Sequence, residues 1–125
     1  VVEWCDDAVI AIMVEKHETV ENLEDILAID EIDMVQFGSS DYSLSIGKPG
    51  AYDDEQVIEA EWKTIETALD YGVAPRAEIN HPDAAEPYLD MGVRDFNLNK
   101  DIRIIHDWLQ THGNELDTKT DGYTR

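Results

Sequence analysis

The sequence predicts an α/β fold in which four strands, each followed by a helix, form one parallel sheet. Three observations favour it: short, largely apolar runs bounded by polar or glycine-containing segments, helical periodicity after the runs, and glycine where two of the helices end. Right-handed crossovers between such units give a parallel sheet covered by helices. We interpret residues 1–110 as this domain and residues 111–125 as a polar C-terminal tail.

The first two units follow from apolar runs. Val9–Val14 and Met34–Phe37 are predicted as buried strands because each run is short and ends at a polar residue or glycine. A helix is expected from Thr19, its predicted N-cap, with its apolar stripe formed by Val20, Leu23, Ile26 and Leu27. The acidic segment Ile29–Asp33 connects this helix to the second strand.

The third unit has the longest predicted helix, Asp54–Tyr71, with Gly72 at the position after its end. Its expected buried face consists of Val57, Ile58, Trp62, Ile65 and Leu69. The strand Val73–Ile79 should follow. Pro75 has no N–H to donate within that strand.

The last predicted elements are the helix Asp83–Met91, the strand Val93–Asn99 and the helix Asp101–Gln110. Asp83 and Glu86 have capping-box spacing, and Pro87 predicts an irregular first turn. We expect the apolar side chains of the final helix, Ile102, Ile105, Trp108 and Leu109, to make its contacts. Residues 111–125 have no apolar period, which predicts a flexible tail or an arm that becomes ordered only against a neighbour.

Charge and composition exclude several classes of partner. The chain has 9 Lys and Arg against 29 Asp and Glu, so its formal charge is −20, which argues against nucleic acid and anionic membranes as partners. The single cysteine, Cys5, excludes an intrachain disulfide framework. No signal peptide or run of about 18 apolar residues is visible, and we expect a soluble, cytoplasmic protein.

The segment Gly38-Ser39-Ser40-Asp41 is the strongest candidate site in the pattern. It follows a predicted buried strand, its glycine permits a tight turn, and its free backbone N–H groups can face an anion. Asp41 then stands at the carboxyl end of a strand, where chemistry collects in α/β folds. The alternative interpretation is that Asp41 only caps a helix.

Alternation along the strands places polar residues together. If Glu15 faces the interior of the fold, then Met13 does as well, and in the third strand Arg76, Glu78 and Asn80 share one face. In the fourth strand, Asn97 and Asn99 share one face. This pattern suggests a polar lumen, and the alternative is that Arg76 and Glu78 only pair with neighbouring residues.

Six segments resemble one known family, the HpcH/HpaI aldolases and citrate lyases. The segments are Ile12-Met13-Val14-Glu15, Val20-Glu21-Asn22-Leu23, Val35 to Ser43, Ile46-Gly47-Lys48-Pro49-Gly50, Glu66 to Leu69, and Tyr88 to Val93. The resemblance covers roughly residues 8–110. It implies a TIM barrel, of which strands five to eight are present here.

The resemblance also implies a divalent-metal site. Glu15 is similar to the first metal-binding carboxylate of the family and Asp41 to the second, and the metals that the resemblance implies are Mg²⁺, Mn²⁺ and Co²⁺. The substrate-binding segment is Gly38, Ser39, Ser40 and Asp41, whose backbone N–H groups resemble those that hold the carboxylate of pyruvate. Such a metal polarises the keto oxygen of a 2-oxo acid and stabilises the enolate formed by retro-aldol cleavage.

The chain departs from the family pattern at several positions. Met13 stands where many members have Gln, and Asn99 stands where the last strand usually ends in Gly. The family's catalytic His and Arg belong to the first half of the barrel, which nothing here matches. His81, at the end of the third strand, is a weak catalytic candidate.

Two functional hypotheses therefore stand. In the first, the chain is part of a metal-dependent aldolase or lyase that cleaves 4-hydroxy-2-oxo acids to pyruvate and an aldehyde. In the second, it is a non-catalytic half barrel or an assembly module. In either case an open parallel sheet exposes its edges and one face, so we expect a homo-oligomer, at least a dimer.

Overall fold

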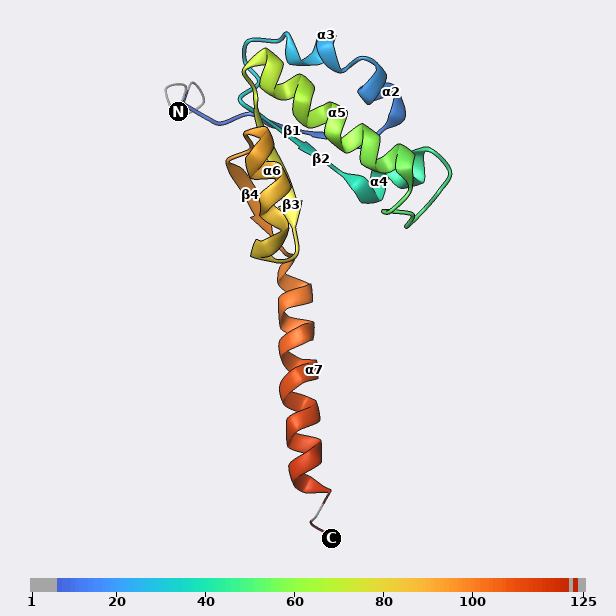
Figure 1. Cartoon of the computed structure of the whole chain (residues 1–125), viewed down its shortest axis with the longest axis vertical. Helices are drawn as coiled ribbons and strands as arrows, with labels where there is room; N and C mark the ends of the chain where they lie inside the picture. The colour runs from blue at the N-terminus through green and yellow to red at the C-terminus, as the bar shows by residue number, and fades with distance from the viewer. Residues whose placement is uncertain (1–6, 122, 124–125) are drawn as a thin grey trace.

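The computed structural model describes residues 7–121 and 123, and it contains a four-stranded parallel sheet (Figure 1). The strands are β1 (Ala11–Val14), β2 (Met34–Phe37), β3 (Ala74–Ile79) and β4 (Asp95–Leu98), arranged in the order β1-β2-β3-β4. Each lies within a segment predicted as a strand, so the α/β parallel fold class is confirmed. Cys5 lies outside the described residues.

Two short helices replace the single one predicted after β1. They are α2 (His17–Glu21) and α3 (Leu23–Leu27), separated at Asn22 by a non-helical backbone with φ −107° and ψ 21°. The prediction of Thr19 as N-cap was wrong, because the helix begins at His17, with only two residues between it and β1. The apolar stripe is kept across the break, since Val20, Leu23 and Leu27 are all buried.

The long helix α5 (Glu55–Tyr71) has the predicted ends. Asp54 caps it by accepting a hydrogen bond from the N–H of Gln56 at 3.1 Å, and Gly72 follows in the left-handed conformation with φ 73°. Val57 and Ile65 are buried and Trp62 and Leu69 pack against the core, as predicted, but Ile58 is 40 % exposed. The buried face is therefore rotated in part, toward Ala60, Thr64 and Ala68. Small side chains at Ala60 and Ala68 allow α5 to lie close to the sheet.

The segment after β3 is irregular, as Pro87 indicated. A 3-10 turn, η1 (Pro82–Ala85), leads into the short helix α6 (Glu86–Met91). The predicted capping role of Asp83 was wrong, because His81 occupies the N-cap position and its Nδ1 accepts the N–H of Asp83 at 3.3 Å.

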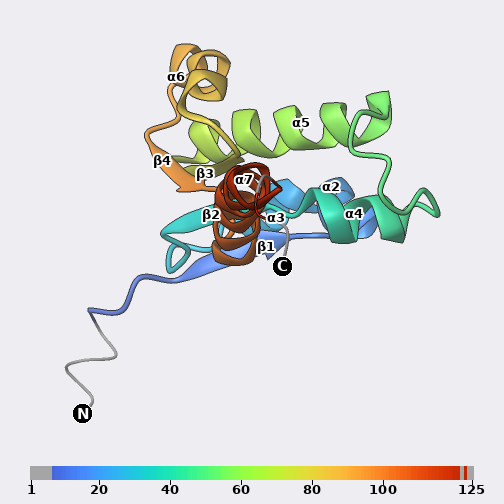
Figure 2. The same ribbon diagram turned by 90° about the horizontal axis from the view of Figure 1, so that it is seen from below.

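The helices α2, α3, α5 and α6 cover a single face of the sheet, and Figure 2 shows α5 and α6 above the strands. One core cluster joins β1 and β2 to α2, α3 and α5, and a second joins β3 to α5 and α6. The opposite face has no helix over it among the described residues, and Met13 on that face is 50 % exposed. Parallel sheets are normally covered on both faces.

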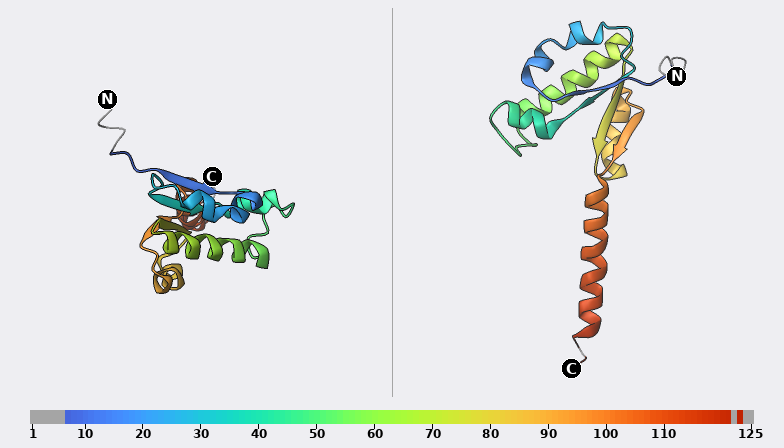
Figure 3. Two further views of the ribbon diagram at one scale, coloured as in Figure 1. Left: turned by 90° about the horizontal axis from the view of Figure 1, so that it is seen from above. Right: turned by 180° about the vertical axis from the view of Figure 1, so that it is seen from behind.

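The last helix, α7 (Asp101–Thr120), is ten residues longer than predicted and leaves the sheet on its own (Figures 1 and 3). The prediction that the helix ends at Gln110 was wrong, since it continues to Thr120. In the added part, the hydroxyls of Thr111 and Thr118 donate hydrogen bonds to carbonyls four residues earlier. Every residue of α7 is exposed. The contacts expected for Ile102, Ile105, Trp108 and Leu109 are therefore absent from the described chain, and the division into domain and tail stays a prediction.

None of the helices described for residues 7–121 is both long enough and apolar enough to cross a membrane.

Candidate functional site

The predicted site begins where β1 and β2 end side by side. The N–H of Gly38 donates to the carbonyl of Val14 at 2.9 Å, which aligns the ends of the two strands. The Glu15 side chain lies over Gly38, because a Cβ built on that glycine would meet Glu15 Cγ at 2.7 Å and Oε1 at 3.1 Å. Gly38 is therefore required to let the half-buried Glu15 carboxylate lie across the end of β2.

Asp41 lies in the first turn of α4 (Ser39–Ser45), which starts directly after β2. Gly38 takes the N-cap position, so the interpretation of Asp41 as a helix cap was wrong. Asp41 is exposed and Glu15 half-buried, and both belong to the carboxyl edge of the sheet. Within residues 7–121 and 123, no three His, Cys, Asp or Glu side chains form a cluster able to hold a metal.

A chain of hydrogen bonds crosses the face of the sheet that the helices leave open. Gln36, which is buried, pairs in register with Arg76 and accepts its Nε–H. The amide nitrogen of Gln36 approaches Glu78 Oε2 at 3.5 Å, and Lys100 Nζ lies 3.2 Å from Glu78 Oε1. The predicted grouping of Arg76 and Glu78 on one face is thus realised, and Gln36 joins the two residues.

A cavity of about 420 Å³ opens at the carboxyl ends of β2, β3 and β4. Ser39 and Ser40, both predicted to bind substrate, lie in its wall, whereas Glu15 and Asp41 do not. Its lining also includes Glu61 of α5, Glu78 and Lys100. The cavity therefore adjoins the predicted binding segment without including the predicted metal ligands.

The wall of the cavity contains a half-buried acid that the sequence analysis missed, Glu61. Tyr88 donates a hydrogen bond from its hydroxyl to Glu61 Oε1 at 3.0 Å. Burial is the main cause that raises the pKa of Glu61, the hydrogen bond from Tyr88 opposes this rise, and the charge of Glu78 adds to it. Burial and the adjacent Glu61 carboxyl also raise the pKa of Tyr88. The available signal was a carboxylate on the same helical stripe as Val57, Thr64 and Ala68.

The histidines are engaged in local contacts. His81 is exposed, lies 3.2 Å from the Asp83 carboxylate and does not line the cavity, so its catalytic role stays a prediction. His17 Nδ1 lies 3.1 Å from the hydroxyl of the buried Tyr42, and its backbone N–H donates to Ser45 Oγ at 3.2 Å. These contacts attach the start of α2 to α4.

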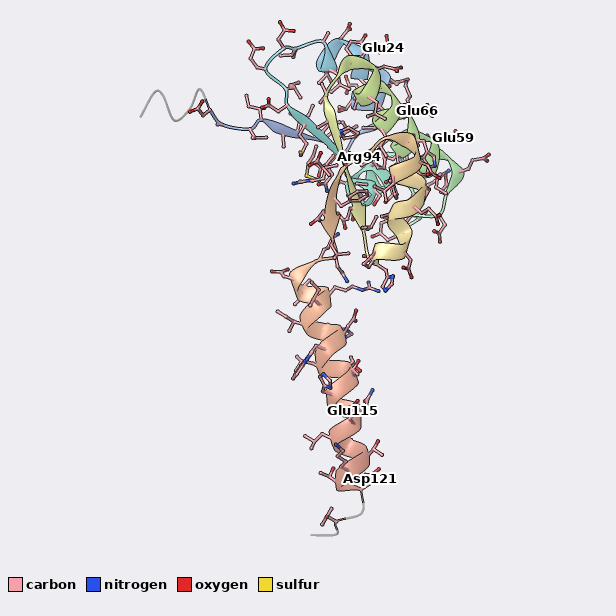
Figure 4. The ribbon with its side chains drawn as sticks, turned by 60° about the vertical axis from the view of Figure 1, so that its left-hand side comes forward. Glu24, Glu59, Glu66, Arg94, Glu115 and Asp121 are labelled. Carbon is pink, nitrogen blue, oxygen red and sulfur yellow. The ribbon has the colours of Figure 1, made fainter. Side chains whose placement is uncertain are left out.

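Acidic side chains are spread over the outer surfaces of the helices. Figure 4 labels Glu24 on α3, Glu59 and Glu66 on α5, and Glu115 on α7, and all of them are exposed. This distribution fits a solvated acidic surface more than a single anionic binding site.

The family model described as "HpcH/HpaI aldolase/citrate lyase" matches residues 5–93. A hydroxypyruvate/pyruvate aldolase from Cupriavidus necator is 32 % identical over 90 residues, which cover 70 % of this chain and 32 % of that protein.

Several solved protein structures are also similar to this chain. The citrate synthase SbnG matches with a TM-score of 0.88 and 25 % identity, over 95 % of this chain and 49 % of that one. An HpcH/HpaI aldolase from Desulfitobacterium hafniense matches with a TM-score of 0.81 and 22 % identity, over 92 % of this chain and 46 % of that one. The chain therefore spans between a third and a half of these relatives, and its arrangement is that of half of a TIM-barrel-type protein.

Replacement of Glu61 by Gln should make stability less dependent on pH. A group whose pKa is raised by folding adds to the free energy of unfolding below its ordinary pKa, which is 4.5 for Glu61. This contribution is lost as the pH rises through the pKa of the group in the folded protein. Glu61→Gln should therefore gain stability relative to the parent protein as the pH rises from about 4 to about 7. Urea unfolding at several pH values measures this difference.

Glu59→Gln, a neutralisation at an exposed position of the same helix, is the matched control and should show no such trend. A constant difference between Glu61→Gln and the parent protein across this pH range would contradict the assigned burial of the charge.

Proposed function

Because this chain belongs to the HpcH/HpaI aldolase/citrate lyase family, we propose that it binds a 2-oxo acid, with pyruvate as the common unit, through a divalent metal held by Glu15 and Asp41. The reaction proposed for the complete site is cleavage of 4-hydroxy-2-oxo acids to pyruvate and an aldehyde. The observation that carries the proposal is the placement of the Glu15 carboxylate over Gly38, at the edge where Asp41 follows the next strand.

The donor set fits a hard cation on which members of this family generally depend. Two carboxylates supply oxygen ligands and leave most positions of an octahedral Mg²⁺, Mn²⁺ or Co²⁺ shell for water and for a substrate. When bound, such a metal acts as a Lewis acid on the keto oxygen of the substrate. Met13, whose thioether is a weak acceptor, adds no hard donor beside them.

The segment Gly38 to Asp41 is the proposed binding site for the carboxylate of pyruvate. The N–H groups of Ser39, Ser40 and Asp41 form the first turn of α4, have no partner within the helix and can donate to an anion, whereas the N–H of Gly38 donates to the carbonyl of Val14. Ser39 and Ser40 add hydroxyl groups and open onto the cavity, which leaves space for the remainder of a larger substrate.

Replacement of Glu15 by Gln should weaken binding of Mg²⁺ or Mn²⁺ by at least about tenfold, since an amide oxygen has no charge to offer. Gly38→Ala should weaken it as well, because the added methyl group displaces the Glu15 side chain. Titration calorimetry with pyruvate present measures both effects. Glu24→Gln, an exposed acid on α3, is the control, and equal affinities in the parent and in Glu15→Gln would remove Glu15 from the site.

The second candidate function is a non-catalytic assembly module, and two exposed surfaces favour it. One is the open face of the sheet. The other is the apolar stripe of α7, which we define as Ile102, Ile105, Leu109 and Leu116, all exposed and spaced three, four and seven residues apart. A second copy of the chain that covers these surfaces would bury them, most simply about a two-fold axis that brings eight strands together.

The 125-residue chain should sediment as a dimer or larger species, and its association should strengthen with salt, which screens the repulsion between two chains of charge −20. Leu109→Glu should weaken the association, because it places a charge in the apolar stripe. Asn114→Glu adds the same charge on the other side of α7 and should change it less. A folded monomer at all salt concentrations would contradict the assembly.

Turnover separates the two candidates. We expect the isolated chain to release little or no pyruvate from a 4-hydroxy-2-oxo acid with added metal, because it has no counterpart of the catalytic His and Arg that the family resemblance implies for the other half of the barrel. A coupled assay for pyruvate measures this release. Metal-dependent release that is lost in Glu15→Gln would establish the catalytic candidate instead.

A further inference from the structure

The connector between β1 and α2 holds Glu15 between two backbone contacts. Only Glu15 and one further residue lie between the end of β1 at Val14 and the start of α2 at His17. Before the connector, the carbonyl of Val14 accepts the N–H of Gly38 at 2.9 Å. After it, the N–H of His17 donates to Ser45 Oγ at 3.2 Å. The backbone of Glu15 is therefore fixed on both sides.

The partners in these two contacts also flank Asp41. Gly38 lies three residues before Asp41, as the N-cap of α4. Ser45 lies four residues after Asp41 in the same helix, which places the two side chains one turn apart on the same side of α4. The segments that contain Glu15 and Asp41 are thus joined twice, once at the sheet and once where α2 lies beside α4 (Figure 2).

The hydroxyl of Ser45 caps α2 from a different helix. Lys16, the N-cap residue of α2, makes no side-chain cap hydrogen bond. The first N–H groups of a helix have no partner within it, and the N–H of His17 finds its partner in Ser45 Oγ. The same hydroxyl donates to the carbonyl of Tyr42 at 2.8 Å, which fixes its direction. Ser45 therefore acts as acceptor toward α2 and as donor within α4.

A buried tyrosine adds a side-chain contact at the same junction. Tyr42 is 1 % exposed and packs against Phe37, with the two ring centroids 5.1 Å apart. Its hydroxyl lies 3.1 Å from Nδ1 of His17, and the rings of these two residues meet edge to face with centroids 6.2 Å apart. Because Tyr42 is fixed in the core, this contact holds the first residue of α2 against α4.

We propose that Ser45, assisted by the Tyr42 hydroxyl, is a positioning residue that sets the separation of the Glu15 and Asp41 carboxylates and thereby the affinity for a divalent cation. This inference rests on the proposed function, in which these two carboxylates are the ligands. A hard cation needs its oxygen ligands at short, defined distances, and ligands that are already held in place lose less conformational freedom on binding. Carboxylates from two segments have this advantage only when the segments are joined, and Ser45 joins them on the helical side.

Removal of the Ser45 hydroxyl should lower the affinity for Mn²⁺ roughly threefold to tenfold. This is below the roughly tenfold to hundredfold loss that follows when a residue bonded directly to a metal ligand is replaced. Ser45→Ala tests the loss, and Ser45→Thr, which keeps a hydroxyl at this exposed position, should restore most of the affinity. Electron paramagnetic resonance of free Mn²⁺ measures binding to the 125-residue chain, at high ionic strength to weaken nonspecific binding to the acidic surface.

A matched control and a metal-free measurement accompany this titration. Thr67→Ala removes a hydroxyl that donates to a carbonyl of its own helix, as that of Ser45 does, and should leave the affinity unchanged. Tyr42→Phe removes only the side-chain contact and should lower the affinity less than Ser45→Ala. Amide hydrogen exchange without metal should show faster exchange of the His17 N–H in Ser45→Ala and unchanged protection of the Gly38 N–H. Circular dichroism checks that each variant is folded.

The outcomes distinguish this inference from the proposed function. Mn²⁺ binding that is lost in Glu15→Gln and unchanged in Ser45→Ala would overturn the positioning role and keep the metal site. Binding that is unchanged in Glu15→Gln would overturn the metal assignment, and the positioning role with it. Equal losses in Ser45→Ala and Thr67→Ala, or a Ser45→Thr protein that binds as weakly as Ser45→Ala, would reveal a general effect on stability and overturn the inference alone.

Discussion

The candidate site depends on the absence of a side chain at Gly38. Backbone pairing between Val14 and Gly38 brings the ends of β1 and β2 together, and the Glu15 side chain occupies the space that a Cβ on residue 38 would fill. Gly38 is also the N-cap of α4, so the same residue ends a strand, starts the helix that contains Asp41 and leaves room for the neighbouring carboxylate. No other residue type meets the steric requirement, because every other side chain begins with a Cβ.

The same sheet face serves both the site and the expected assembly. The helices bury Val14, Val35 and Ala77 on one side, and strand alternation then places Glu15, Gln36, Arg76 and Glu78 on the other. That open face is polar near the carboxyl ends of the strands. It exposes Met13, which lies on β1, two residues before Glu15. A partner that covered the apolar part would exclude water around the polar part and strengthen its electrostatic interactions, so the proposed assembly would favour the proposed ligand binding.

The local sequence was sufficient to predict the four strands, the ends of α5 and the irregular segment after β3. Short apolar runs indicate buried strands, and Asp54, Gly72 and Pro87 each act on the backbone at their own position. The break at Asn22 and the rotated face of α5 depend on how helices fit against the sheet, which no single segment encodes. Gln36 was missed because it lies within an apolar run, and Glu61 because it was assigned to the polar surface of a helix. Their roles depend on partners 40 and 27 residues away in the sequence. The continuation of α7 was missed because residues 111–120 add only Leu116 to its apolar stripe, while threonine hydroxyls bond back to carbonyls four residues earlier within the helix.

The distribution of charge gives the carboxyl edge a field different from that of the remaining surface. A chain with charge −20 repels anionic 2-oxo acids at long range, but this repulsion is screened beyond about 8 Å at physiological ionic strength. The open face and its edge contain Arg76, Lys100 and Arg103, which are three of the nine cations in the chain. The cavity at this edge also contains Asp53, Glu61 and Glu78, and Lys100 is paired with Glu78, so the local field is set by cations and carboxylates together.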